Sequence, residues 1–534
     1  MAVGDVTATH QLAGTEGAPH PHDRQLMDRK WWTLIAVSVG TFMLLLDITI
    51  VNVALPDIQR SLHASFSELQ WVVDAYALTL ASLLLTAGSL ADLYGRRLLF
   101  TIGLVLFTLG SLCCGLSTSP LFLIVSRSGQ GLGGAIMFST ALALLAQAFR
   151  GRERGTAFGV WGAVTGFAVA VGPVLGGLIT SGIGWRWIFL VNVPIGVVGV
   201  LITWSQVEES RQEGARRPDW RGFVLFTGGL VSLIYGLIRA NETSWTSTAV
   251  LACFAAAAVL VGAFLVAERV GRNPMFDLSL FRVPTFSGAA VAAFGMAASL
   301  FSLLLYIVLY LQDVLGYSAL ATGVRLLLLS GASLVTAFAA GRLSARMPVR
   351  WLIGPGLVLI GVGQLLMAGL HPDTGWTHLV PGFLLGGLGI GMVNPPLAST
   401  AVGVVQPQRA GMAAGINNTF RQVGIATGIA ALGSIFAVRV RHDILQSLSR
   451  IPDVAHRAGG VATALVQGNN PVTAAGVHGM QAAQVAEAAR SAFVSGMNVI
   501  LVIGGVVALV SAVLSTVLIR SRDFVSSTPV PAAG

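Results

Sequence analysis

The chain alternates long apolar runs with short polar gaps. Fourteen such runs can be followed along it, and a helix of about 20 apolar residues crosses the ~30 Å hydrocarbon core of a bilayer. The pattern therefore predicts an all-α polytopic membrane protein with fourteen transmembrane helices, grouped as six, two and six. The expected helices lie near residues 32–55, 71–91, 98–117, 120–147, 157–182, 187–206, 222–239, 247–267, 286–311, 318–341, 351–370, 378–404, 411–437 and 493–518.

Composition supports the same prediction. Of 534 residues, 10% are charged and 54% are hydrophobic, whereas soluble domains average about 25% charged residues. The net charge of +9 does not indicate nucleic-acid binding, because the Arg residues lie in short gaps between apolar runs rather than on a continuous basic face. The length of the chain therefore reflects membrane spans, and the lipid bilayer is its main partner.

Metal, cofactor and enzyme chemistry is not indicated. Cys113 and Cys114 are adjacent in one apolar run and Cys253 lies in another, so neither a disulfide framework nor a metal spacing is visible. The expected spans contain no His/Glu metal spacing and no Ser/His arrangement. We expect a non-enzyme without a cofactor.

The distribution of Arg residues predicts the orientation. With the N-terminus inside, nearly every inside gap carries several Arg residues, whereas the short outside loops hold Arg60, Arg186 and Arg239. This asymmetry sets orientation during insertion, so both termini are expected in the cytoplasm. The outside segment 438–492 also carries Arg residues, but long loops cross with less regard to charge. We expect it to be a partly helical or loose excursion.

An internal repeat divides the chain. The sequence AGSLADLYGRRLLF at the end of the second helix is echoed by AGRLSARMPVRWLI at the end of the tenth. Two similar bundles facing each other are typical of a rocking transporter. The expected parts are a cytoplasmic tail (1–30, which lacks the apolar core of a signal peptide), a first six-helix bundle (31–207), two inserted helices with cytoplasmic linkers (208–284), a second bundle including the 438–492 loop (285–520) and a second tail (521–534).

Three ionisable residues fall inside the first six expected spans. Asp47, Asp74 and Arg127 lie about 12, 5 and 10 Å from the outer helix ends, at ~1.5 Å per residue. Charges inside a span usually face the protein interior or a wet cavity and mark function. Asp47 can carry a proton, with Asp74 and Arg127 beside it; alternatively the ion pair is permanent and sets helix packing, and Asp74 sits at a wet rim.

Two further patterns lie in the first half. Asp92 ends the second expected helix in a short turn with Gly88, Gly95, Arg96 and Arg97, and we interpret it as a gate whose contacts break when the bundles rock; the alternative is an ordinary helix-end charge cluster. The glycines and proline of the fifth expected helix predict a bend and tight packing. These residues are Gly172, Pro173, Gly176 and Gly177.

Amides and one cation can line a central cavity. No carboxylate lies at mid-membrane in the last six expected helices, and Asp313 lies just past the outer end of the ninth, so proton chemistry is expected in the first half. Interhelical hydrogen bonding is the alternative role for the candidate lining residues. The candidates are Asn52, Gln130, Asn394, Asn417, Asn418 and Arg421.

These residues resemble a known family, the fourteen-helix drug:proton antiporters of the major facilitator superfamily, from about residue 31 to residue 520. LDITIVNVALP (46–56) resembles the motif of the first helix, and GSLADLYGRR (88–97) resembles the signature between the second and third helices. RSGQG (127–131) resembles the fourth-helix motif, whose Arg the resemblance links to proton transfer. GPVLGG (172–177) resembles the exporter motif, and WRWIFLVNVPIG (185–196) resembles the fourteen-helix branch.

The resemblance implies efflux, with two departures. Leu93 stands where the signature usually has Arg, which can weaken the gate, and Ala168 stands where the exporter motif usually begins with Gly. Some multidrug members carry an extra acid in a second-half helix that serves dicationic drugs. No such acid is present here, so the resemblance favours monovalent or neutral amphipathic compounds.

The sequence therefore predicts a proton-coupled antiporter of the cytoplasmic (inner) membrane, working as a monomer. It is expected to export amphipathic drugs or antibiotics by alternating access, with small amphipathic substrates and protons as its partners. One alternative is transport of a single endogenous metabolite, such as a self-made antibiotic, siderophore or lipid, because fold reasoning does not separate these functions. A second alternative is a membrane sensor that transports nothing.

Overall fold

The fold is helical throughout the part of the chain that can be described. The computed structural model describes residues 21–149, 151–211, 218–271, 274, 276–344, 346–405, 410–449, 454, 457–466 and 471–524. In these residues fourteen helical segments are long and apolar enough to cross a membrane, which confirms the predicted fold class. Most of both expected cytoplasmic tails, residues 1–20 and 525–534, lies outside the described residues.

The first six spans run from α1 to α7, because the short helix α6 and helix α7 share one span. Several helices begin at a serine cap, which satisfies backbone N–H groups that a helix leaves free. Ser65 and Glu68 form a reciprocal capping box at the start of α2. The helices are α1 (Pro21–Leu62), α2 (Phe66–Tyr94), α3 (Arg96–Gly115), α4 (Pro120–Ala148), α5 (Gly151–Gly182), α6 (Trp187–Leu190) and α7 (Asn192–Gln206).

The inserted pair and the last six spans follow. One span is built from α10, α11 and the π-helical turns η2 and η3. The elements are α8 (Trp220–Glu242), α9 (Thr248–Val270), η1 (Leu278–Arg282), α10 (Pro284–Met296), η2 (Ala297–Phe301), α11 (Ser302–Leu309), η3 (Tyr310–Val314), α12 (Ala319–Leu343), α13 (Arg350–Met367), η4 (Trp376–Leu379), α14 (Val380–Gly403), α15 (Ala410–Leu448), α16 (Ala458–Val466), α17 (Pro471–Ala475), α18 (Met480–Leu518) and η7 (Ser521–Asp523).

The two groups of six spans pack in the same way. Helix α4 packs against both α2 and α3, and α14 packs correspondingly against both α12 and α13. Helix α1 packs on α5 in the first group, as α10 packs on α15 in the second. The groups then meet through the exchanged pairs α5–α12 and α2–α15. We use first and second bundle for the two groups.

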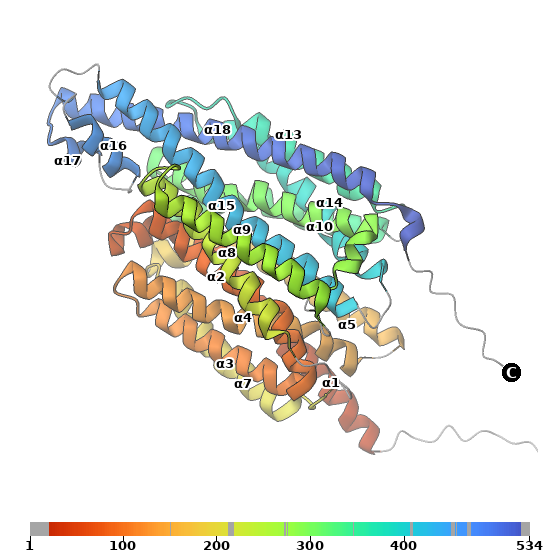
Figure 1. Ribbon diagram of the computed structural model, residues 1–534. Helices are drawn as coiled ribbons and strands as arrows, with labels where there is room; N and C mark the ends of the chain where they lie inside the picture. Colours follow the sequence, from red (N-terminus) through yellow and green to blue (C-terminus); the bar gives the residue numbers. More distant parts are fainter. Residues whose placement is uncertain are drawn as a thin grey trace, which may run out of the picture.

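The inserted pair covers one seam between the bundles. Helices α8 and α9 pack on each other, and α8 also packs on α15 and on α2, beside which it lies in Figure 1. Asp219 caps the start of α8 by accepting from the N–H of Gly222 at 2.9 Å, and Ser247 caps α9. The pair therefore bridges the seam rather than forming a separate domain.

The segment 438–492 is largely helical in its described residues. Helices α15 and α18 each have 39 residues and continue beyond the apolar spans predicted from sequence, with α16 and α17 near their ends in Figure 1. Val440, Ile444 and Leu448 recur at helical spacing and are buried, as are Val485 and Ala489 of α18. This apolar stripe explains why the segment is ordered as helix. We call the end of the molecule that carries it the outer side, following the predicted orientation.

Candidate functional site

Asp47 is the centre of a buried polar network in the first bundle. Its side chain is 0% exposed, and its Oδ2 accepts from Nη1 of Arg127 at 2.5 Å. Its Oδ1 accepts from Nε2 of Gln130 at 2.8 Å, and the same nitrogen is 2.7 Å from the hydroxyl of Ser111. Nε of Arg127 donates to the carbonyl of Val72 at 3.2 Å. Both charges are therefore paired and hydrogen-bonded, which is the condition for tolerating a buried ion pair.

This network lies inside one bundle. Asp47 is on α1 and Arg127 on α4, and the Arg127 guanidinium stacks 4.2 Å from the ring centroid of Tyr76 on α2. Gln130 was a candidate cavity residue, but it is 0% exposed and bridges Asp47 to Arg127 and Ser111. It therefore orients the ion pair and does not line the central cavity described below.

Asp74 is not part of that network. It is 0% exposed, and neither of its carboxylate oxygens has a hydrogen-bond partner among the described residues. It lies one turn after Gln70 on α2, whose Nε2 donates to the carbonyl of Ile429 on α15 at 3.0 Å. Residues four apart share a helix face, so Asp74 lies on the face of α2 that meets the second bundle. In this conformation it does not sit at a wet rim.

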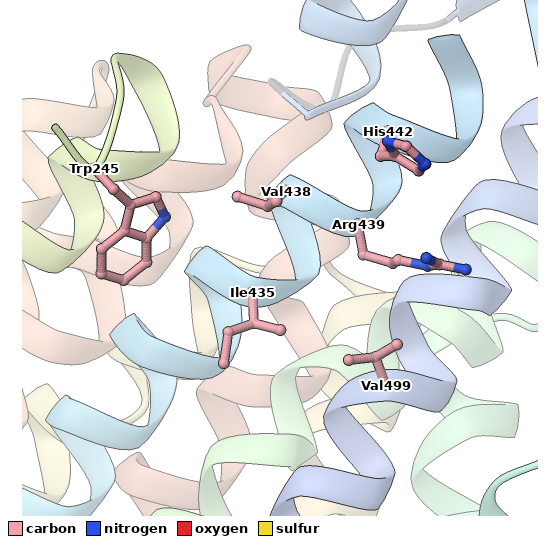
Figure 2. A pocket seen from close by; sticks show the side chains of 6 residues that line it. All are labelled: Trp245, Ile435, Val438, Arg439, His442 and Val499. Atoms are coloured by element: carbon pink, nitrogen blue, oxygen red, sulfur yellow. The ribbon is translucent and has the colours of Figure 1, made fainter. Parts of the chain in front are cut away.

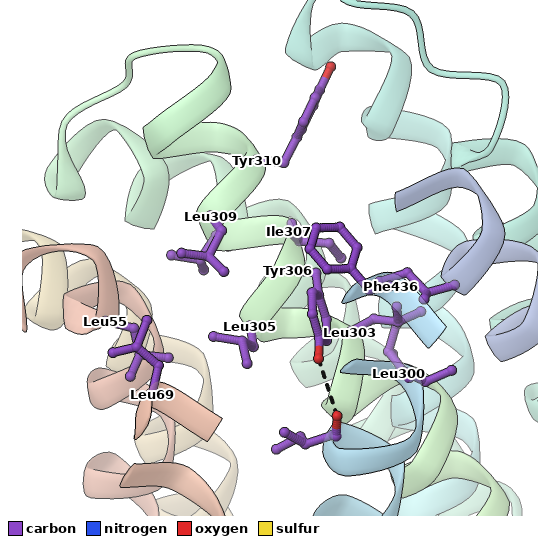
Figure 3. Close-up of a cluster of buried hydrophobic side chains, with 14 of the residues drawn as sticks. Leu55, Leu69, Leu300, Leu303, Leu305, Tyr306, Ile307, Leu309, Tyr310 and Phe436 are labelled. Carbon is purple, nitrogen blue, oxygen red and sulfur yellow. Dashed lines mark hydrogen bonds between the residues drawn. The ribbon is translucent and has the colours of Figure 1, made fainter. Parts of the chain in front are cut away.

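The outer side of the seam is closed by packing and hydrogen bonds. The Tyr306 hydroxyl on α11 donates to the carbonyl of Ile429 at 3.2 Å, and its ring packs beside Phe436, as Figure 3 shows. Nε2 of Gln312 on η3 donates to the carbonyl of Val53 on α1 at 2.8 Å. The apolar side chains around Tyr306 in Figure 3 come from both bundles. In this conformation Asp74 itself is fully buried.

Glycines of α5 allow its close approach to two helices. A Cβ on Gly172 would clash with the Thr49 hydroxyl on α1, and a Cβ on Gly177 would lie 2.7 Å from the Cα of Leu320 on α12. Next to this contact, the Leu320 N–H donates to the Ser181 hydroxyl at 3.1 Å. The motif expected to pack tightly thus lies between α1 and the second bundle, with Pro173 inside the helix.

A central cavity lies between the bundles. It is lined from α1 and α5 of the first bundle and from η2, α11, α12 and α14 of the second. Asn52 lines it, whereas Asn394, Asn417, Asn418 and Arg421 do not border it directly. The lining is mainly aliphatic, with few polar groups. It includes Thr49, Asn52, Pro173, Leu300, Phe301 and Ser330.

The turn between α2 and α3 forms the candidate gate. Asp92 Oδ1 accepts from Nε and Nη2 of Arg96 at 3.0 and 2.8 Å. Gly95 has a φ of +124°, a conformation that favours glycine. Among the described residues, no hydrogen bond joins the last two turns of α2 to the second bundle. In this conformation the described hydrogen bonds of the gate therefore stay within the first bundle.

Glu209 supports the same turn and was not predicted. It follows α7, and its carboxylate accepts from the backbone N–H groups of Arg97 and Leu98, each at 3.0 Å. A Cβ on Gly95 would lie 2.7 Å from this carboxylate. Glu209 thereby caps the N-terminus of α3, where a negative charge is favourable. It lies outside the recognised motifs, and an acid 111 residues from its partner carries no local sequence signal.

A separate hollow lies on the outer side. It is bordered by residues of α15 and α18 and by the turn between α8 and α9, as Figure 2 shows. Nε of Arg439 is already engaged there, by the Ser495 hydroxyl and by Asp443, each at 3.1 Å. No described residue of α1 or α5 lines this hollow, and it takes no part in the candidate site. Its lining residues are Trp245, Ile435, Val438, Arg439, His442 and Val499.

Comparison with known proteins decides the family. Residues 37–429 match the family model described as Major Facilitator Superfamily. The chain belongs to the major facilitator superfamily. Multidrug resistance protein Stp of Mycobacterium tuberculosis is 39% identical over 427 residues, covering 80% of this chain and 79% of that protein. The tetracenomycin C resistance and export protein of Streptomyces glaucescens is 35% identical, covering 95% of each chain.

Solved structures agree on the fold. A bacterial homologue of the human lysosomal transporter Spinster matches with a TM-score of 0.61 at 17% identity, covering 96% of this chain and all of that chain. Another relative, the drug efflux pump JefA of Mycobacterium tuberculosis, is 33% identical over 497 residues. As a major facilitator protein with fourteen candidate spans, this chain is a multi-pass membrane transporter whose relatives are drug and antibiotic efflux proteins.

The cavity wall of this major facilitator protein was largely missed from sequence. Phe301, Leu300, Leu304 and Val308 line it, yet nothing distinguishes them from lipid-facing or core residues in an apolar run. A weak signal existed for polar members, because Asn52 stands out in the first span. Apolar specificity residues of this kind are visible only once the bundles are assembled.

Proposed function

We propose that the protein is a proton-driven antiporter that exports an amphipathic drug or antibiotic across the cytoplasmic membrane, working as a monomer. The observation that carries the proposal is Asp74, a fully buried carboxylate without a described hydrogen-bond partner at the moving seam between the bundles. Burying an ionised carboxylate without a partner is very costly, so the group is buried neutral. A proton bound from outside thus permits the outer side to close over Asp74.

Alternating access then couples proton and substrate. When the seam between α2 and α15 opens to the outside, Asp74 meets water and can exchange its proton. Substrate in the central cavity must favour the outward-facing state and the proton the inward-facing state, since a ligand without preference shifts no equilibrium. In this state Asp47 is bonded to Arg127 within the first bundle, so we propose that it can share the proton only in a state in which that bond has opened.

Transport in everted membrane vesicles tests the proposal. With the vesicle interior made acid, the wild type is expected to accumulate a fluorescent amphipathic probe. Asp74→Asn is expected to lose gradient-driven accumulation while it still exchanges probe for probe, because its side chain stays neutral. Asp57→Asn is the matched control, since that acid lies at the outer end of α1 beside the exposed Arg60, 2.8 Å away. Accumulation by Asp74→Asn at the wild-type level would reject the proton role.

The range of substrates is tested in the same vesicles. The names of two relatives each specify one antibiotic, tetracenomycin C and actinorhodin, which favours a transporter of a single compound as the second candidate function. A panel of unrelated amphipathic probes separates the two candidates. If only one class of compound is transported, the second candidate function is favoured over multidrug export.

The orientation is tested by cysteine labelling. We propose that both termini face the cytoplasm, from the Arg distribution. In a variant with Cys113, Cys114 and Cys253 replaced by serine, Gly375→Cys before η4 is expected to react with an impermeant reagent added outside whole cells. If the cysteine reacted only in everted vesicles, residue 375 would face the cytoplasm and the proposed orientation would be wrong.

A further inference from the structure

Arg421 is a half-buried cation for which the described residues supply no ion-pair partner. It lies on α15, eleven residues after the helix begins at Ala410, which is about 16 Å at ~1.5 Å per residue and hence near mid-membrane. Its Nε is buried and has no hydrogen-bond partner, and no described carboxylate forms an ion pair with it. One turn earlier, Oδ1 of Asn417 is also buried and unsatisfied. A charge at this depth usually serves a ligand or an ion pathway.

The guanidinium lies beside the central cavity. Its Cζ is 5.5 Å from the ring centroid of Phe301, and Phe301 lines that cavity from the π-helical turn η2. Two neighbours on α15 define the other faces of the helix. Thr419 donates to the carbonyl of Ala81 on α2, and Gly424 approaches the carbonyl of Phe294 on α10. Arg421 lies on the part of the helix surface between these two faces, beside Phe301.

Arg421 gives the region next to Phe301 a positive charge. The described lining of the cavity includes no acidic residue, and the charge of Asp47 is compensated by Arg127. A low-dielectric site strengthens such a field. A cationic compound would be repelled by Arg421, whereas a carboxylate or ionised phenol fits the planar fork of a guanidinium, which binds such groups with two hydrogen bonds.

We infer that the exported substrate is an amphipathic anion, whose acid group is held by Arg421 while its apolar body packs on Phe301 and the aliphatic wall. This inference rests on the proposed export function and narrows its substrate class. Asn417 supplies an amide beside the acid group. The acid group of the substrate thus supplies the counter-charge that Arg421 lacks.

A series of matched probes tests the inference. Three fluorescent probes share one aromatic body and differ in one group: a carboxylate, a neutral carboxamide or a primary amine. Gradient-driven uptake into everted vesicles is compared for the wild type, Arg421→Gln, Arg421→Lys and the control Arg325→Gln. The control removes an outer-side cation that donates to the carbonyl of Ala321 and lies 3.6 Å from the Tyr317 ring centroid.

The expected result is selective loss. Arg421→Gln should lower kcat/KM for the carboxylate probe by about tenfold or more, the factor for losing a charge-assisted hydrogen bond, with the amide probe little changed. Arg421→Lys should recover part of the loss, and the control should keep the wild-type preference. Equal loss for all three probes, or a wild-type preference for the amine, would overturn the inference.

A binding measurement separates this inference from the export proposal. Fluorescence polarisation with purified protein in detergent reports affinity for the carboxylate probe without a gradient. Tighter binding by the wild type than by Arg421→Gln supports the anion site, whatever the transport assay shows. If no probe is transported by the proton gradient, the export function is rejected but the anion site is not. Equal binding by the two proteins rejects the anion site.

Discussion

The membrane-embedded charges of the two bundles are held in opposite ways. In the first bundle, Asp47 and Arg127 satisfy each other, with Gln130 bridging both. In the second, Arg421 has a ring beside it but no described carboxylate. A charge that is paired within the protein helps to fix the arrangement of its helices, whereas a charge without such a partner is available to bind a ligand. On our proposal, the first bundle holds an ion pair and the second provides Arg421 to bind the substrate.

Breaking the partnered site should have the largest effect. Asp47→Asn leaves Arg127 buried without a counter-charge, and loss of one member of such a pair costs about 3–5 kcal/mol of folding stability. The measurement is thermal unfolding of the purified protein in detergent. Combining Asp47→Asn with Arg127→Gln should recover part of the loss, because no charge is then stranded. Wild-type stability of the single variant would contradict a structural ion pair.

Removing the unpartnered cation should have the opposite sign. Arg421→Met eliminates a buried unsatisfied donor, whose desolvation costs about 1–3 kcal/mol, and keeps an unbranched side chain. We expect the unfolding temperature to rise while uptake of an anionic probe falls. A lower unfolding temperature would mean that Arg421 already has a structural partner.

The capped turn at the gate lies between these extremes. Glu209→Ala leaves the N–H groups of Arg97 and Leu98 without their acceptor and should cost about 1 kcal/mol, as for loss of a helix cap. Glu209→Gln keeps an acceptor and should cost less. Hydrogen exchange of the Arg97 and Leu98 amides measures the effect directly, and unchanged protection in Glu209→Ala would exclude the cap.

Asp74→Asn should change folding stability least. If the carboxyl group is buried neutral, as we propose, an amide of almost the same size changes stability by no more than about 1 kcal/mol. The same unfolding measurement serves, with Asp47→Asn as the contrasting acid. A loss as large as that of Asp47→Asn would indicate that Asp74 is ionised and paired in the folded protein.

The sequence predicted the spans well because membrane insertion depends on local properties. A run of apolar residues must satisfy its own backbone as a helix, so length and hydropathy sufficed for the helices that contain Asp47 and Arg127. From their depths, Asp47, Asp74 and Arg127 were expected to be able to meet. The structure joins Asp47 and Arg127 and leaves Asp74 outside their network. A transmembrane helix can be predicted from sequence because its own apolar residues determine where it forms.

The parts that were missed depend on distant partners. Gln130 was expected at a cavity, but whether an amide faces a cavity or an ion pair depends on how α1 and α4 are rotated about their axes. Phe301 resembles any aromatic in an apolar run, and Glu209 acts on a turn far away in sequence. The helical character of 438–492 was underestimated because Val440 packs next to Gly496 of α18, a residue far from it in sequence.

The length of α15 and α18 has a mechanical consequence. Both helices run without interruption from the second bundle into the outer excursion, so any tilt of that bundle would also move their outer ends. From residue 437 to residue 448, α15 extends about 16 Å at ~1.5 Å per residue. A small tilt of the bundle would give a larger sideways displacement at the outer ends of these helices than within the membrane. A spectroscopic label placed there would report the tilt and would lie far from the transport path.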